Sequence, residues 1–238
     1  MKTFYLPIVL SIMLIAGASS CKKNSNNTAT NTDTVVNARI ATIQINESGS
    51  ITSWRIVYDT QNRVDSIIEI APGTTPSVKK FAYSASSYTI TGFSNSDSSV
   101  NKVTLNPDGT INSIYRALQD TIYIAYGANG VAQIKNNEYG QSFTSNYTWI
   151  YGDIDSASSP PSNGETYFYN INYLWQIGDG ISIFDFMDYG RPTIHSKHLM
   201  TEQVYDGTSE KYSYKFDNRS RITQLTVGSE TYNYTYTN

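Results

Sequence analysis

A short motif that recurs along the chain limits the possible folds more than any other feature of the sequence. Two apolar residues separated by one position precede an Asn or Asp, two or three turn-forming residues follow, and a segment with alternating apolar residues comes next. Asn and Asp start turns by bonding to backbone groups ahead of them, so each copy predicts a β-hairpin. The copies are residues 43–55 (IQINESGSITSWR), 56–68 (IVYDTQNRVDSII), 103–115 (VTLNPDGTINSIY), 214–226 (YKFDNRSRITQLT) and a shortened copy at 124–134 (IAYGANGVAQI).

The residues between the apolar segments also match turn chemistry. Gly49 and Gly109 adopt a positive φ without steric cost, and we expect Asn62 to serve the same purpose in its copy. The first two copies abut, so the strand at 51–58 belongs to two successive hairpins. This arrangement predicts a meander that grows strand by strand.

Aromatic residues alternate with polar ones in several segments. In 166–175 (TYFYNINYLW) we expect Tyr167, Tyr169, Ile171, Tyr173 and Trp175 to share one face, and segments 211–217 and 231–236 alternate in the same way. No window shows sustained helical periodicity. The sequence therefore predicts an all-β antiparallel meander of repeated β-hairpins, forming a curved sheet or a small soluble barrel. A membrane-spanning barrel is disfavoured because Thr, Ser and Asn occur on both faces of the predicted strands.

The N-terminus has the features of a secretory signal. Met1-Lys2 precede an apolar run from Phe4 to Ile15, which is too short to span a membrane, and small residues lead to Cys21. This arrangement resembles the lipobox of bacterial lipoproteins, although Ala18 stands where that motif usually has Leu. We expect residues 1–20 to be a signal peptide and Cys21 to be lipidated, and the alternative is ordinary cleavage beside an incidental cysteine.

Residues 21–38 lack the apolar residues that a folded core requires. Asn, Thr and Ser dominate this segment, so we expect a flexible tether with a span of roughly 23 Å. A single folded domain would then occupy residues 39–238. These features predict an outer-membrane lipoprotein of the cell envelope that is held to the membrane by its lipid anchor, with the periplasmic and the surface-exposed locations both open.

Two of the turns resemble the YD-type repeats of bacterial surface proteins. Tyr58-Asp59 with Asn62-Arg63, and Phe216-Asp217 with Ser220-Arg221, carry the likeness. With the lipobox and the tether, the chain resembles lipoproteins of Bacteroidota, among them a domain of unknown function with a porin-like β fold. This resemblance implies a fold and indicates little about function. Residues 143–203 contain no clear copy of the motif.

Composition excludes several classes of function. With 20 acidic and 17 basic residues the net charge is −3, which gives no reason to expect nucleic-acid binding. One cysteine rules out an intrachain disulfide framework and a cysteine-rich zinc site. The sequence contains no nucleophile elbow, phosphate loop, dinucleotide fingerprint or paired-histidine zinc motif. We therefore expect no cofactor and no enzymatic activity. An enzyme that uses an unrecognised site is the alternative to the two non-catalytic hypotheses described below.

Aromatic residues at strand ends are the candidate ligand-binding residues. Trp149 and Tyr151 lie beside the loop 152–164, and Trp175 precedes a predicted tight turn at Gly178-Asp179-Gly180. Exposed indole and phenol rings stack well on sugar rings. In the same loop, Asp153 and Asp155 are weak calcium candidates, since their spacing matches no known calcium loop.

Two functional hypotheses follow from these features. The first is a non-catalytic structural or interaction protein at the outer membrane that offers its curved sheet to a protein partner. The alternative is a carbohydrate-binding lipoprotein that captures polysaccharide with Trp149, Tyr151 and Trp175. The exposure of these three rings distinguishes the two hypotheses, because burial of all three would argue against sugar binding.

Overall fold

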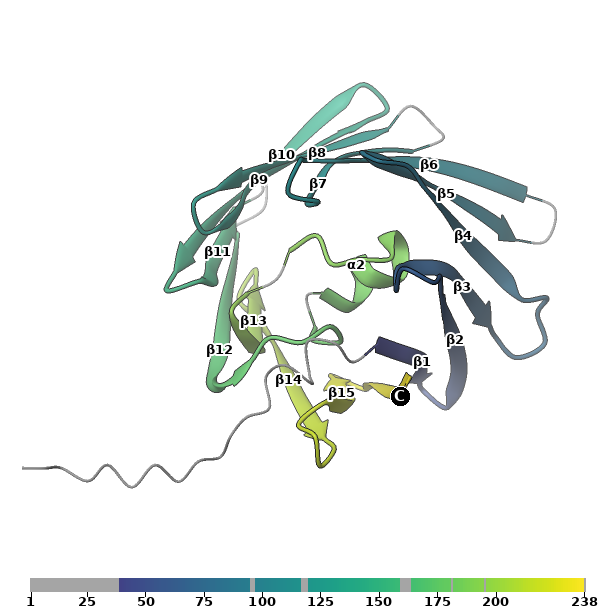
Figure 1. The fold of residues 1–238 in the computed structure, drawn as a ribbon. Helices are drawn as coiled ribbons and strands as arrows, with labels where there is room; N and C mark the ends of the chain where they lie inside the picture. Colours follow the sequence, from purple (N-terminus) through teal and green to yellow (C-terminus); the bar gives the residue numbers. More distant parts are fainter. Residues whose placement is uncertain are drawn as a thin grey trace, which may run out of the picture. The chain divides into compact units, whose positions relative to one another are not determined.

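The chain folds into a closed β-barrel (Figure 1). The computed structural model describes residues 39–94, 97–116, 120–158, 164–180, 182–194 and 196–237. Each strand pairs antiparallel with its neighbour in sequence, and β1 pairs with β16 to close the sheet. The predicted all-β meander is confirmed, and the sheet is a barrel. The predicted signal peptide, Cys21 and the tether lie outside the described residues.

Within these ranges the barrel has sixteen strands and one helix. The elements are β1 (Arg39–Glu47), β2 (Ser50–Tyr58), β3 (Val64–Ile70), β4 (Ser77–Tyr83), β5 (Ser87–Ser94), β6 (Asp97–Leu105), β7 (Ile111–Tyr115), β8 (Thr121–Gly127), β9 (Gly130–Glu138), β10 (Gln141–Ile150), β11 (Asp153–Ser158), β12 (Glu165–Leu174), α2 (Ser182–Tyr189), β13 (His198–Tyr205), β14 (Thr208–Phe216), β15 (Ile222–Val227) and β16 (Glu230–Thr237).

The segments that carry the turn motif are hairpins, as predicted. They form the pairs β1–β2, β2–β3, β6–β7, β8–β9 and β14–β15. Asp59 Oδ1 accepts hydrogen bonds from the backbone N–H groups of Gln61 at 2.8 Å and Arg63 at 2.9 Å. Asn62 has a φ of 63° and Gly109 one of 84°, which confirms their expected left-handed conformations.

An Asp–Arg pair closes two of these turns and covers an aromatic ring. Arg63 Nε donates to Asp59 Oδ2 at 2.8 Å, and its guanidinium lies 4.2 Å from the ring centroid of Tyr83. Arg221 repeats this arrangement with Asp217 at 2.7 Å and with the Tyr236 ring at 4.6 Å. Desolvation opposes ionisation of Asp217, but hydrogen bonds from the backbone and side chain of Arg221 outweigh it, and the pKa of this carboxyl is lowered. The charged pair therefore holds the turn and orients the arginine over the next hairpin.

Aromatic side chains also tie neighbouring hairpins together at one end of the barrel. Each ring packs inward and donates a hydrogen bond to a carbonyl near the start of the preceding odd-numbered strand, so its polar atom is satisfied. The pairs are Tyr58 Oη to Ile40 O at 2.9 Å, Tyr83 Oη to Val64 O at 2.9 Å, Trp149 Nε1 to Val131 O at 2.7 Å, Tyr214 Oη to Met200 O at 2.7 Å and Tyr236 Oη to Ile222 O at 2.7 Å. We call this the latched end. It is the end at which β1 begins and β16 finishes, and the opposite end is the far end.

The connection between β12 and β13 runs inside the barrel, where Figure 1 shows α2 surrounded by strands. We call residues 175–180, 182–194 and 196–197 of this connection the plug segment. Asp179 caps α2 by accepting a 2.8 Å bond from Ser182 N–H, and Gly190, with a φ of 71°, ends the helix. The predicted turn at Asp179 is therefore also a helix start. Tyr88 Oη donates to Tyr189 O at 2.8 Å, which fixes the end of α2 to the barrel wall.

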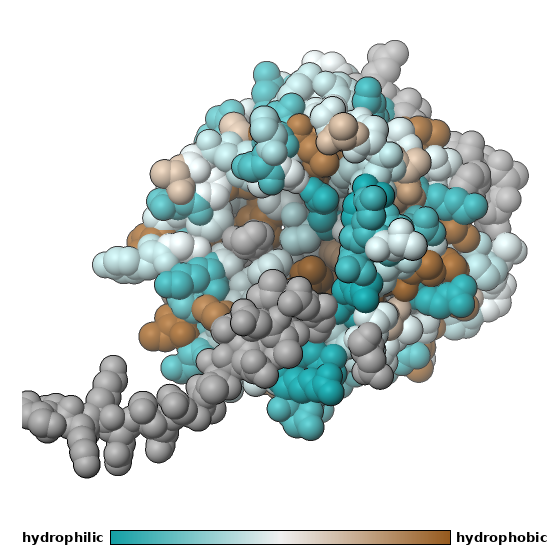
Figure 2. Space-filling view, in the orientation of Figure 1, coloured by the Kyte–Doolittle hydropathy of each residue, from teal (hydrophilic) through white to brown (hydrophobic). Residues whose placement is uncertain are grey.

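Buried side chains pack inside the barrel around its cavities, and charged and apolar residues are both exposed on its outer face. Ile43, Ile114, Ile183 and Leu225 are fully buried, so the plug and the wall form one core. On the outer positions, charged residues such as Arg55, Lys80, Lys102 and Lys135 are exposed. A barrel that spans a membrane carries lipid-facing apolar residues at such positions. Figure 2 shows hydrophobic residues scattered among hydrophilic ones on the visible face.

The expected aromatic ladder at 166–175 is only partly correct. Tyr167 and Tyr169 pack against the core, but Ile171 is 76% exposed. The pairing of β12 with β13 shifts between Asn170 and Leu174, which breaks the alternation. The prediction was wrong for Ile171 because strand register, and not only residue type, determines which face a side chain occupies.

No helix of the described chain is long and apolar enough to cross a membrane.

Candidate ligand-binding site

Two of the predicted aromatic residues line the same cavity. Trp149 lies at the penultimate position of β10, Trp175 directly follows β12, and both face a cavity of about 380 Å³ at the latched end. Cavities of roughly 300 to 1,000 Å³ are typical of small-molecule sites. We call this cavity the tryptophan pocket. Its other walls come from the β6–β7 and β8–β9 turns and from residues 191–194 of the plug segment.

Trp149 is held in place by the backbone beside it. Its Nε1 donates to Val131 O at 2.7 Å, and a Cβ on Gly130 would lie 2.6 Å from the indole ring. Only glycine permits this approach, and its φ of 143° is a conformation that other residues rarely adopt. Trp175 is positioned by its backbone N–H, which donates to Lys197 O at 2.9 Å. Both indoles are partly buried and are thus placed as pocket walls.

Polar groups surround the two indoles. Asp108 accepts hydrogen bonds from Thr110 Oγ1 at 2.6 Å and from Thr110 N–H at 2.9 Å, and these bonds lower the pKa of its carboxyl. Arg191 donates to Gly109 O and lies over the Tyr88 ring at 5.7 Å. Asn129 adds an amide. The pocket therefore combines two flat apolar rings with a carboxylate, a guanidinium and an amide, which suits a ligand with both apolar faces and hydroxyl groups.

The other predicted site residues lie outside the tryptophan pocket. Tyr151 is 92% exposed in the turn between β10 and β11. Asp153 Oδ2 lies 2.7 Å from His198 Nδ1, and its Oδ1 accepts a 2.8 Å bond from His198 N–H. Asp155 is exposed and accepts a 3.4 Å bond from Thr148 Oγ1. The described part of the chain contains no group of three or more His, Cys, Asp or Glu residues that could hold a metal ion.

Sequence reasoning missed the polar walls of the pocket. Asp108 and Asn129 lie in predicted hairpin turns, and their sequence signal is that of turn formation alone. Arg191 belongs to the plug segment, whose path through the barrel no local pattern indicates. Closure of the barrel and insertion of the plug bring these residues to the tryptophans.

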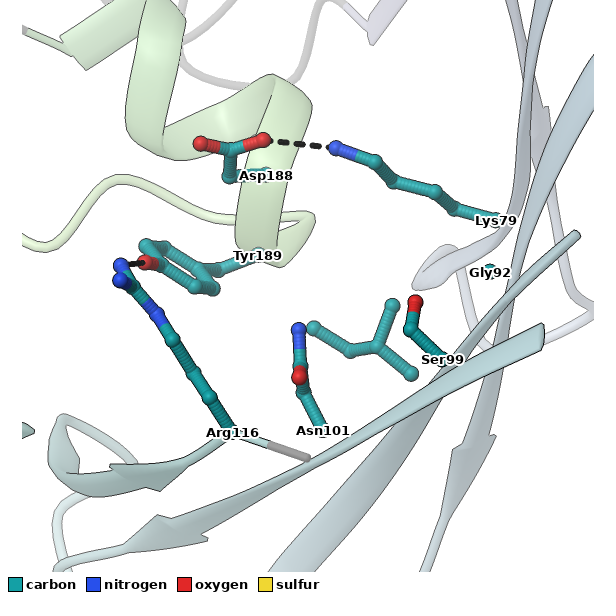
Figure 3. Close-up of a pocket in the computed structure, with 8 residues that line it drawn as sticks. Lys79, Gly92, Ser99, Asn101, Arg116, Asp188 and Tyr189 are labelled. Carbon is teal, nitrogen blue, oxygen red and sulfur yellow. Dashed lines mark hydrogen bonds and ion pairs between the residues drawn. The ribbon is translucent and has the colours of Figure 1, made fainter. Parts of the chain in front are cut away.

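A second cavity lies on the far-end side of α2 (Figure 3). It has a volume of about 320 Å³, and we call it the α2 pocket. Lys79 Nζ lies 2.6 Å from Asp188 Oδ1, and Arg116 Nη2 donates to Tyr189 Oη at 2.8 Å. A third cavity of about 380 Å³ shares Arg116 and Tyr189 with the α2 pocket and reaches Asp185.

Asp185 gives the barrel a pH-dependent contribution to stability. Burial raises the pKa of this carboxyl, against the opposing effect of the 3.0 Å hydrogen bond from Thr193 N–H. The native state therefore holds the proton more strongly than the unfolded chain. Its contribution is fully present below the ordinary aspartate pKa of about 4 and is lost as the pH rises through the raised native value.

We expect Asp185→Asn to raise the free energy of unfolding by about 1 kcal/mol at neutral pH, because the amide keeps an acceptor for Thr193 and removes the buried charge. Urea denaturation at neutral pH and near pH 3 measures this, with the exposed Asp155→Asn as the control. The gain should vanish at the acidic pH. An equal gain at both pH values would contradict the assignment.

These features define a class of structure: a closed, sixteen-stranded antiparallel barrel with an internal plug and ligand-sized cavities on both sides of it. No family model and no curated protein matches the sequence. Among solved structures, a porin-like protein from Bacteroides uniformis is similar with a TM-score of 0.61 and 15% identity, covering 83% of this chain and 98% of that one. A porin-like protein from Bacteroides vulgatus has a TM-score of 0.36 and 9% identity, covering 84% and 99%.

The first of these likenesses concerns the fold. It confirms the porin-like β fold that the sequence resemblance implied. The lipid anchor and the kinship with YD-type repeats stay predictions.

Proposed function

We propose that this protein is a non-catalytic, envelope-anchored binding protein that holds a carbohydrate in the tryptophan pocket. The observation that carries the proposal is the convergence of Trp149 and Trp175 on one cavity with Asp108, Asn129 and Arg191. The apolar faces of a sugar ring pack on indole, while its hydroxyl groups bond to carboxylate, guanidinium and amide.

The test is a polysaccharide screen by affinity gel and glycan array, followed by titration of any sugar that binds. Trp175→Ala should weaken saturable binding by roughly 10-fold or more, since it removes one stacking surface. Tyr123→Ala is the matched control, because Tyr123 is an exposed aromatic residue on β8 outside the pocket. Absence of sugar binding by the folded protein, or an equal loss in both variants, would refute the proposal.

The proposal also includes attachment to the membrane through Cys21. The barrel itself would remain in water, in keeping with charged outer residues such as Arg55 and Lys102. A diacylated and N-acylated cysteine would anchor the chain stably. We expect Cys21→Ser to move the protein from the membrane fraction to the soluble fraction on cell fractionation. Unchanged membrane association would contradict lipid anchoring.

A second candidate is a structural or protein-interaction role. It is favoured by apolar side chains exposed near the latched end, among them Tyr151, Ile171 and Leu174. Crosslinking of the membrane-bound protein to its partners distinguishes the two candidate functions. A partner bound through this surface should no longer be crosslinked in Ile171→Asp, while sugar binding is retained.

A further inference from the structure

The two cavities on the far-end side of α2 have complementary chemistry. The α2 pocket is polar and is lined by Lys79, Asn101 and Arg116. The adjoining cavity, which we call the isoleucine cavity, exposes apolar and polar surface in similar amounts, and its polar part includes Asp185, Thr193 and Gln203. Its apolar wall consists of Ile114, Ile122, Ile124, Ile134, Ile154 and Ile194. Arg116 and Tyr189 line both cavities, so a polar compartment that holds two cations and the Asp188 carboxylate adjoins one with a wall of isoleucines. We propose that the barrel interior binds an amphiphilic anion, with its headgroup at Arg116 and Lys79 and its apolar body in the isoleucine cavity.

Arg116 supplies a cation without a close carboxylate. Its guanidinium donates to the Tyr189 hydroxyl at 2.8 Å, and burial raises the pKa of that phenol, which keeps it neutral. Among the described residues, no carboxylate lies within the 4.0 Å ion-pair distance of Arg116, while Asp188 and Asp120 act on it from farther away. A planar guanidinium in a partly buried wall is well suited to bind a carboxylate, sulfonate or phosphate.

Lys79 supplies a second cation whose present partner is exchangeable. Its Nζ lies 2.6 Å from Asp188 Oδ1 and donates to Met187 O at 3.1 Å. The Asp188 side chain is 59% exposed, so water competes for this ion pair and a ligand anion could replace the aspartate. Figure 3 shows Arg116 reaching the Tyr189 hydroxyl from one side of the pocket, while Lys79 reaches Asp188 from the other side.

The absence of a side chain at Gly92 leaves space for the headgroup. Gly92 and Ser99 are paired across β5 and β6, and a Cβ on Gly92 would lie 2.9 Å from Ser99 Oγ. A larger residue at this position would fill the pocket. The apolar body would lie on Ile122 and Ile134, the isoleucines of the cavity wall that are only partly buried. Burying an alkyl chain there is favourable because it leaves water for an apolar wall.

This inference is independent of the proposed carbohydrate site. The cationic groups at its centre, Lys79 and Arg116, do not line the tryptophan pocket. Sugar binding and amphiphile binding can therefore fail separately in the same preparation.

The experiment titrates the full mature chain with the fluorescent anion 8-anilinonaphthalene-1-sulfonate and then displaces it with decanoate or with decanol. Saturable binding is expected, with decanoate displacing the probe at a concentration about 10-fold or more below that of decanol. Arg116→Gln should weaken decanoate about 10-fold and leave decanol unchanged. Lys102→Gln is the matched control, because it removes the same charge from an exposed residue of β6.

A second variant keeps the test decisive if Arg116→Gln does not fold. Ile134→Phe fills the isoleucine cavity and should weaken decanoate and decanol equally, while thermal unfolding confirms that each variant is folded. The proposal is overturned if the folded protein binds none of the probes saturably. It is also overturned if decanoate and decanol bind equally, or if Arg116→Gln behaves like Lys102→Gln.

Discussion

Replacing Gly180 with alanine is expected to lower the free energy of unfolding by about 3 kcal/mol, the upper range for inserting a methyl group into a packed core. The added Cβ would lie 2.2 Å from Tyr212 Cε1 and 3.0 Å from Met200 Cε. The Tyr212 ring is not free to move aside, because its hydroxyl donates to Gln203 at 3.0 Å or Glu210 at 2.9 Å. The clash therefore has to be relieved by the plug segment or by the barrel wall.

Gly127→Ala is the matched control for this substitution. Its Cβ would meet Ala132 Cβ at an ordinary 3.5 Å, and no strained backbone is involved. Urea denaturation followed by tryptophan fluorescence should show a change of less than about 1 kcal/mol for this control. Equal effects at both glycines would show that the plug segment does not press on Tyr212 as the structure describes.

The hairpins could be predicted from sequence because their causes are local. Asp59 bonds to backbone groups two and four residues ahead, and Asn62 adopts its left-handed conformation within the same turn. Closure of the barrel has no such local cause. It depends on pairs such as Thr42 with Thr235, and the alternation of apolar residues does not determine how many strands separate the first from the last.

The plug segment shows a second limit of sequence reasoning. α2 has only 8 residues, which is too short for helical periodicity to stand out from the surrounding strands. Its position is set by contacts with distant residues, such as the hydrogen bond that the Tyr88 hydroxyl donates to Tyr189 O. The strand-end positions of Trp149 and Trp175 were predictable, but their shared pocket was not, because the plug segment forms one of its walls.

Replacing Asp179 should have the next largest effect on stability after Gly180, for a different reason. It is fully buried, and its Oδ1 accepts the 2.8 Å hydrogen bond from Ser182 N–H that begins α2. We expect Asp179→Ala to lower the free energy of unfolding by about 2 kcal/mol, because the helix loses its cap and a buried donor loses its acceptor. Asp179→Asn should recover most of this loss, since asparagine caps helices about as well as aspartate does.

The same substitution tests whether α2 forms the cavity walls as a unit. Asp185, Asp188 and Tyr189 all lie on this helix and line the two cavities on its far-end side. Loss of the cap should therefore loosen these cavities together, which hydrogen exchange of the α2 amides measures directly. Asp188→Ala on the same helix removes only an exposed ion pair and should change stability by less than about 1 kcal/mol. If Asp179→Ala left α2 exchange unchanged, packing of Ile183 and Phe186, rather than the cap, would be what holds the plug.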